Sequence, residues 1–197
     1  PSSFKTVPSQ ALLVSTICPI NISSPMVMIS AFTNLSLNFE TTKILSMDQF
    51  SPSELILNED GSVYHLGLLG ADIPELIFTV GDPDRVASVS QHFDTILWTK
   101  TRREFTITRG TLNQHEVLVL STGMGTDNID IVLNELDAAV NIDPVTRTRN
   151  EVPRKLKIIR IGTSGAVDPT IKVGTLLHSV GALAFDALLP FYEHNFK

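Results

Sequence analysis

The sequence has a single cysteine, Cys18, among its 197 residues. One cysteine cannot form an intrachain disulfide, and without a cysteine cluster a cysteine-based zinc site is excluded. Long apolar runs are also missing, since none approaches the roughly 18 residues that a membrane-spanning helix needs. There is no basic excess either, because 15 basic and 21 acidic residues give a formal net charge of −6. This balance argues against a general nucleic-acid binder, so any anion site must be local.

The first 46 residues are poor in charge. Lys5, Glu40 and Lys43 are their only charged residues, and prolines interrupt any helical pattern. An organellar transit peptide would be rich in arginine, and this stretch has none. A targeting leader is one interpretation, but we favour a disordered extension or upstream sequence. The predicted organisation is an extension over residues 1–46 and one folded domain over residues 47–197.

The remainder of the chain alternates between strand and helix patterns. Strands are predicted at residues 76–80, 105–108, 116–120, 158–161 and 173–180. One helix is predicted after Asp84, which is placed to cap it, and Val86 and Val89 share its apolar face. A second helix is predicted from the region of Thr126 to Val140, with capping candidates at its start. This alternation is typical of an α/β domain.

Three of the predicted strands end in loops that contain glycine. These loops begin at Gly81, at Ser121 and at Gly162. In open α/β sheets, ligands bind at the carboxyl ends of the strands. Arg85 follows the first loop and Arg160 precedes the third, so the pattern favours a phosphate-sized anion beside a polar organic ligand. The alternative for Arg85 is a surface position after an ordinary turn.

Arg160 interrupts an otherwise apolar strand. Ile158, Ile159 and Ile161 are β-branched, as a strand covered on both faces requires. A guanidinium in such surroundings needs an anionic partner. That partner is either a bound anion or an internal carboxylate, and the residues alone leave both interpretations open. The five histidines show no metal-ligand spacing, and no nucleophile–base pair is visible.

The order and content of five short motifs resemble the nucleoside phosphorylase family of the uridine phosphorylase type. The motifs are His65-Leu66-Gly67-Leu68, Gly81-Asp82-Pro83-Asp84-Arg85, Arg103-Glu104-Phe105, Ser121-Thr122-Gly123-Met124-Gly125 and Arg160-Ile161-Gly162-Thr163-Ser164-Gly165. The resemblance implies a three-layer α/β fold around a mixed, partly barrel-like central sheet. Family members continue well past the position of Lys197, so we expect the C-terminal part of the domain to be missing.

The resemblance also implies a reaction, which is reversible phosphorolysis of a nucleoside to free base and ribose 1-phosphate. Uridine or a related pyrimidine nucleoside is the implied substrate, and inorganic phosphate is the co-substrate. Phosphate would be held by Gly81, Arg85, Arg103, Arg160 and Thr163. Of these, Arg85, Arg160 and Thr163 are the implied catalytic residues.

Further roles follow from the same likeness. Arg103 would reach into the phosphate site of a neighbouring subunit, and His65 would approach that neighbour's ribose. Ser164 and Gly165 would lie near the base. Glu104 matches a residue that lines a monovalent cation site in some members, although residues 126–128 depart from the usual pattern there. We expect a cytoplasmic homo-oligomer, dimeric or hexameric, with no resident cofactor, no metal site, and no nucleic-acid or membrane partner.

Two other functions are compatible with these motifs. A nucleosidase on a related fold would use water in place of phosphate, but it would not need Arg85, Arg103 and Arg160 together. A non-catalytic storage or ligand-binding relative would keep the fold without the reaction. Phosphate-dependent release of the base distinguishes the three.

Overall fold

The computed structural model describes residues 27–32, 49–179 and 188. The strands are β1 (Val27–Phe32), β2 (Leu76–Val80), β3 (Thr95–Arg102), β4 (Phe105–Leu112), β5 (His115–Ser121), β6 (Lys157–Thr163) and β7 (Leu177–His178). The helices are α1 (Asp84–Ser90), α2 (Thr126–Asn141) and the short 3-10 helix η1 (Gly70–Asp72). Within these ranges, no helix is both long enough and apolar enough to cross a membrane.

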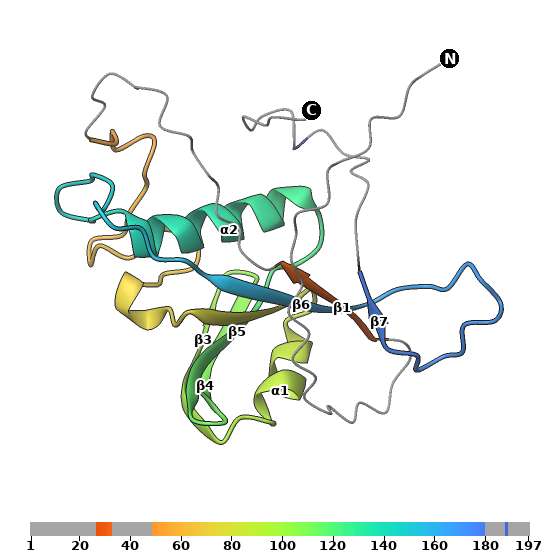
Figure 1. Cartoon of the computed structure of the whole chain (residues 1–197). Coiled ribbons are helices and arrows are strands. Elements are labelled where there is room, and N and C mark those ends of the chain that lie inside the picture. The colour runs from red at the N-terminus through yellow and green to blue at the C-terminus, as the bar shows by residue number, and fades with distance from the viewer. Residues whose placement is uncertain (1–26, 33–48, 180–187, 189–197) are drawn as a thin grey trace, which may run out of the picture.

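One mixed sheet contains all of these strands, in the order β3-β4-β5-β2-β6-β1-β7 (Figure 1). Strand β2 is central and pairs in parallel with both β5 and β6. The hairpin β4–β5 and the pair β3–β4 are antiparallel. The predicted mixed sheet is confirmed, and in the described residues it stays open, with β3 and β7 at its edges, and does not close into a barrel.

Two apolar cores lie on opposite faces of this sheet, because side chains alternate along each strand. The core under α2 combines Val132, Leu136 and Val140 with Ile77, Phe105, Ile107, Leu118, Leu120 and Ile158. The core under α1 combines Val86 and Val89 with Val80, Val119 and Ile161. Each fully buried side chain of this size contributes about 1.5–3 kcal/mol relative to an exposed one. The predicted three-layer α/β architecture is therefore confirmed (Figure 1).

Both helices begin without the side-chain caps that the sequence predicts. Helix α1 has Pro83 at its N-cap position, and the backbone N–H of Asp84 donates to Asp82 Oδ1 at 3.0 Å. Helix α2 has Gly125 at its N-cap position with φ of 99°, and no side chain caps it. The prediction that Asp84 caps α1 is wrong, because Asp82 forms the local turn and Asp84 is already the first helical residue.

Strand boundaries differ from the prediction at two places. Of the strand expected at residues 173–180, the described residues 173–179 form only β7, because Thr175 N–H closes a turn on the carbonyl of Lys172 and Gly174 has φ of 86°. Strand β3 was not predicted. Most of its side chains are exposed, so it lacks the alternation that marks a half-buried strand.

Strand β1 lies inside the stretch of residues 1–46 that we expected outside the packed domain. It pairs antiparallel with β6, from Val27 opposite Thr163 to Phe32 opposite Ile158. For these six residues the structure differs from the expectation, because an apolar, uncharged segment can add to an open strand edge. The other residues of the stretch lie outside the described ranges, so the boundary at residue 46 stays a prediction.

Candidate functional site

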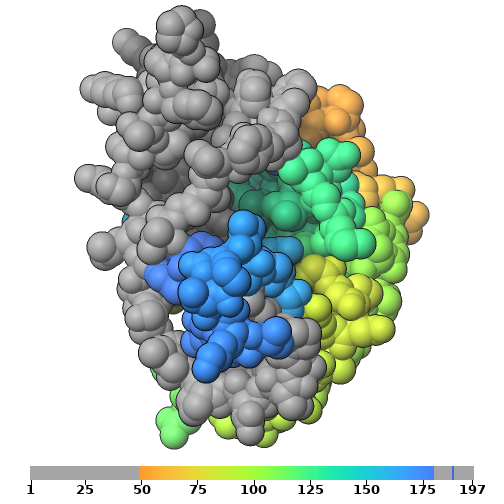
Figure 2. Space-filling view, turned by 90° about the vertical axis from the view of Figure 1, so that its right-hand side faces the viewer, coloured from red at the N-terminus to blue at the C-terminus, as the bar shows by residue number. Residues whose placement is uncertain are grey.

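Parallel pairing brings three loops to one edge of the sheet. Strands β5, β2 and β6 are neighbours, with Val80 opposite Ser121 and Thr79 opposite Arg160. Their carboxyl ends therefore meet, and Figure 2 views this edge, where segments coloured yellow, green and blue come together. We call Gly81, Arg85, Thr122, Arg160 and Thr163 the strand-end group. Four of its five members, all except Thr122, are residues that the family resemblance implies for a phosphate site.

Arg160 is held at this edge by a neighbouring hydroxyl. Its Nη1 donates to Thr122 Oγ1 at 3.2 Å. Thr122 is buried, its hydroxyl lies within donating distance of the carbonyls of Val80 and Gly123, and its backbone N–H donates to the Val80 carbonyl at 2.7 Å. Because a hydroxyl both donates and accepts, Thr122 links the guanidinium to the backbone of β2.

The charge of Arg160 has no carboxylate beside it in the described part of the chain. The close contacts of a basic side chain with a carboxylate there are Arg109–Glu116, Lys157–Glu75 and His65–Glu135. Arg160 is half-buried, and this burial lowers the pKa of its guanidinium from the ordinary value. Desolvation disfavours the charged form, yet arginine stays protonated in proteins. The described residues supply no internal carboxylate for Arg160, and its binding of an anion stays a prediction.

Arg85 approaches the same edge from helix α1. Its Nη1 and Nη2 both lie 3.4 Å from Thr163 Oγ1, at the end of β6. No salt bridge of Arg85 occurs among the described residues, so its donors are only weakly occupied by a neutral oxygen. Two guanidinium groups at one sheet edge suit the planar, forked recognition of a phosphate.

Glycine residues bring the backbone close to Arg160 at this edge. A Cβ built on Gly81 would stand 3.4 Å from Arg160 Nη2 and 3.7 Å from the Gly123 carbonyl oxygen. Gly123 itself has φ of 68°, a left-handed conformation that glycine adopts without strain. The backbone can therefore come close to a ligand at this edge.

Two further predicted residues, His65 and Arg103, lie together elsewhere, with Tyr64 and Glu135 beside them. We call Tyr64, His65, Arg103 and Glu135 the arm group. The Arg103 guanidinium carbon stands 4.8 Å from the centre of the Tyr64 ring, and the Tyr64 and His65 rings meet edge to face at 5.0 Å. His65 Nδ1 lies 2.6 Å from Glu135 Oε1. The structure thus groups His65 with Arg103 and shows no contact of either with the strand-end group in the described residues.

The remaining predicted residues carry fewer contacts. Ser164 and Gly165 follow β6 in the surface loop, and nothing lies within 4 Å of a Cβ built on Gly165. The Glu104 side chain is exposed beside the start of β4. In the described ranges no group of three or more His, Cys, Asp or Glu residues could hold a metal ion. The roles of these residues stay predictions.

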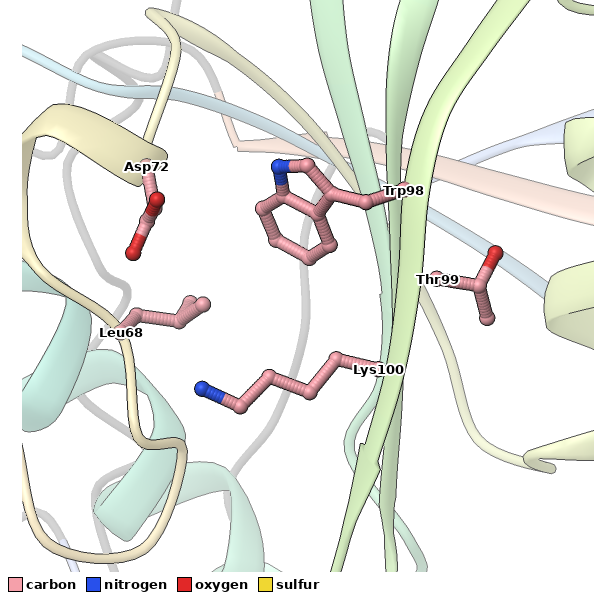
Figure 3. A pocket seen from close by; sticks show the side chains of 5 residues that line it. All are labelled: Leu68, Asp72, Trp98, Thr99 and Lys100. Atoms are coloured by element: carbon pink, nitrogen blue, oxygen red, sulfur yellow. The ribbon is translucent and has the colours of Figure 1, made fainter.

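A cavity of about 260 Å³ opens on another part of the surface. It lies between the turn before η1 and strand β3, and Leu68, Asp72, Trp98, Thr99 and Lys100 line it (Figure 3). None of these residues belongs to either group. The cavity is next to the turn that carries His65. Lys100, which lines the cavity, donates a hydrogen bond to the carbonyl of Gly67 in that turn.

Sequence reasoning assigned no site role to Thr122 or Glu135. Thr122 was visible only as part of a loop of small residues, and the pairing of β2 with β5 and β6 is what brings it to Arg160. Glu135 lies on α2, and its partner His65 is 70 residues away in sequence. No local pattern signals such a pair. The one available hint was a carboxylate next to the apolar face of α2 that Val132, Leu136 and Val140 form.

Comparison with known proteins gives one family. The sequence pattern described as the phosphorylase superfamily matches residues 75–197. The uridine phosphorylase of Treponema pallidum is 33% identical over 123 residues, which cover 62% of this chain and 42% of that protein. The uridine phosphorylase of Escherichia coli is 36% identical over 126 residues, covering 63% of this chain and 44% of that protein. The chain spans less than half the length of these curated relatives.

A solved structure shows a similar match. The nucleoside phosphorylase of Trypanosoma brucei, described as showing uridine phosphorylase activity, is 38% identical in the aligned part. The alignment covers 49% of this chain and 30% of that chain, with a TM-score of 0.46.

Proposed function

Because the chain belongs to the phosphorylase superfamily, we propose that it carries the phosphate-binding part of a nucleoside phosphorylase. The proposed reaction is reversible phosphorolysis of a nucleoside to free base and ribose 1-phosphate. The uridine phosphorylases among its relatives, at 33% and 36% identity, support uridine or a related pyrimidine nucleoside as the substrate. We further propose a cytoplasmic homo-oligomer with phosphate as co-substrate.

The single observation that carries this proposal is Arg160. Its guanidinium is half-buried, bonds to a neutral hydroxyl and has no carboxylate partner in the described ranges. A cation in these surroundings is costly without an anion. Arg85, only 3.4 Å from Thr163 Oγ1, adds a second guanidinium with no carboxylate partner among those residues. Phosphate supplies the charge and the forked oxygen pattern that two arginines recognise.

In the proposed chemistry the transition state is stabilised mainly by electrostatic interactions. As the base leaves, the sugar develops positive, oxocarbenium-like character, as in glycoside cleavage. A phosphate held by Arg85 and Arg160 beside the anomeric carbon stabilises this charge and is also the nucleophile. Its oxygen forms the new bond to that carbon, while the bond to the base breaks and its electrons leave with the base. Positioning and preorganised charge suffice, which explains why no nucleophile–base pair is needed.

The other site residues take supporting roles in the proposal. Thr122 and Thr163 orient the two arginines, and Gly81 lets the phosphate approach the backbone. Ser164 and Gly165 lie at the base. His65 and Arg103 serve the site of a neighbouring subunit, which is consistent with their separation from the strand-end group. A monovalent cation beside Glu104 is an optional part of this proposal.

The test is release of uracil from uridine with and without inorganic phosphate. The proposal expects release that needs phosphate and yields ribose 1-phosphate in equal amount. Release at the same rate without phosphate would identify a nucleosidase. No release, together with retained phosphate binding by calorimetry, would identify a non-catalytic ligand-binding relative. Either of these two outcomes overturns the proposed reaction.

A further inference from the structure

One carboxylate organises the turn that carries His65. Glu135 Oε1 accepts the backbone N–H of His65 at 2.8 Å, and Oε2 accepts the backbone N–H of Leu66 at 2.8 Å. Oε1 also lies 2.6 Å from His65 Nδ1. The Glu135 side chain is only 14% exposed, so these contacts replace water around a largely buried charge. Charge-assisted hydrogen bonds of this kind are stronger than neutral ones.

The same contacts fix which imidazole nitrogen carries the proton. An ionised carboxylate can only accept hydrogen bonds, so the short contact to Glu135 requires a hydrogen on His65 Nδ1. In the neutral imidazole, Nε2 is then a free acceptor. The ring is also packed edge to face against Tyr64, at 81° between the two planes. Both the tautomer and the orientation of His65 are therefore set by its surroundings.

The turn is held on its other side by strand β3. The Lys100 ammonium donates to the carbonyl of Gly67, and Figure 3 shows Lys100 and Leu68 together at the cavity. A Cβ built on Gly67 would stand 2.9 Å from Arg102 Nη1, so the turn packs closely against β3. Lys100 holds the backbone of the turn, whereas Glu135 also holds the His65 ring. Among the described residues, Glu135 is the one that contacts a ring nitrogen of His65, so it is the one placed to set the tautomer.

We propose that Glu135 is a positioning residue of the proposed phosphorylase. It holds His65 as the Nδ1–H tautomer, so that Nε2 accepts a hydrogen bond from a sugar hydroxyl of the nucleoside. A hydroxyl can donate to Nε2 only if that nitrogen is free of hydrogen. This role rests on the proposed function for its substrate. The tautomer itself follows from the contacts of Glu135 alone.

The first experiment measures the tautomer directly. Long-range ¹H–¹⁵N NMR spectra are recorded on the full chain labelled at histidine, at a pH where His65 is neutral. The His65→Asn variant identifies the signals of His65. The expected result is a protonated Nδ1 and an unprotonated Nε2. A protonated Nε2 on the ring assigned to His65 in the parent protein overturns the proposal.

Two variants then distinguish an effect of Glu135 on the His65 tautomer from a general loss of support for the turn. Glu135→Gln replaces one acceptor oxygen by an NH₂ donor, so we expect His65 to lose its single tautomer. Lys100→Met removes the other hold on the turn without touching the ring, and should leave the tautomer unchanged. An unchanged tautomer in folded Glu135→Gln, checked by circular dichroism, contradicts the role of Glu135.

A kinetic measurement separates this inference from the proposed function. In the uridine assay, we expect Glu135→Gln to lower kcat/KM for uridine by about tenfold or more, the scale of losing one hydrogen bond to a charged group. The rise in melting temperature caused by phosphate should stay as in the parent, since Glu135 contacts no member of the strand-end group. Equal kcat/KM in parent and variant overturns the positioning role. A parent without uridine cleavage overturns the proposed reaction instead, and the NMR result then decides whether Glu135 sets the tautomer.

Discussion

The strand-end group and the arm group differ in how many partners a partly buried charge has within the described residues. Arg160 is half-buried beside a neutral hydroxyl, whereas His65 contacts a carboxylate that accepts three N–H groups of one turn. In the arm group the Glu135 carboxylate is satisfied by N–H groups of the turn, and these hydrogen bonds hold the turn in shape. The strand-end group is left with positive charge that the described residues do not neutralise. The comparison supports the proposal that the strand-end group binds an anion and that Glu135 of the arm group holds the His65 side chain in place.

The largest expected effect comes from Arg160. In the parent, phosphate should raise the melting temperature by mass action, and Arg160→Ala should abolish this rise. Without phosphate the variant should be as stable as the parent or more stable, because a cation without a carboxylate is removed from a half-buried position. Turnover of uridine should fall by at least about 10²-fold, and Arg160→Lys should restore little, because an ammonium lacks the guanidinium fork. Thermal unfolding at zero and high phosphate measures the first two effects.

A matched control for this experiment lies on the same strand. Lys157→Ala also removes a cation from β6, but its ammonium is exposed and pairs with Glu75 at 2.7 Å. Such a surface pair contributes about 0–1 kcal/mol, so the variant should keep the full response to phosphate. If Arg160→Ala responds to phosphate as strongly as Lys157→Ala does, the strand-end group is not an anion site.

An effect of intermediate size is expected when a variant of the arm group is mixed with a variant of the strand-end group and the activity of the mixture is measured. If Arg103 serves a neighbouring subunit, a mixture of Arg103→Ala and Arg160→Ala chains should form mixed oligomers in which some sites are intact. Random pairing in a dimer predicts recovery of about a quarter of the parent activity. Each variant alone is the control. No recovery, with mixing verified by mass spectrometry, would mean that both arginines act within one chain.

The smallest expected effect comes from Thr122. Thr122→Val keeps the shape of the side chain but removes the hydroxyl that accepts from Arg160. We expect a loss of stability of about 1–2 kcal/mol from the buried hydrogen bonds and a several-fold weaker affinity for phosphate by calorimetry. Thr101→Val is the same change at an exposed site on β3 and should alter neither quantity. Phosphate affinity unchanged in Thr122→Val would show that Arg160 needs no support from this loop.

Much of the core fold follows from local patterns. The apolar run at residues 76–80 and the spacing of Val132, Leu136 and Val140 predict β2 and the buried face of α2. Strand β3 was not predicted because its side chains are mostly exposed and give no alternating apolar pattern. Its pairing with β4 makes it a strand. Strand β1 escaped because its low charge resembles that of a tail, and only the open edge of β6 makes it part of the sheet.

The sequence by itself determined that glycine-bearing loops follow strands and that Arg85 and Arg160 stand beside them. Its motifs were also sufficient to indicate the family. The tertiary structure decided which groups meet. Parallel pairing of β2 with β5 and β6 puts Thr122 against Arg160, and packing of α2 on the sheet brings Glu135 to His65. Local patterns encode which face of an element is apolar, but contacts between residues 38 and 70 positions apart depend on the order of strands in the sheet, which no local pattern contains.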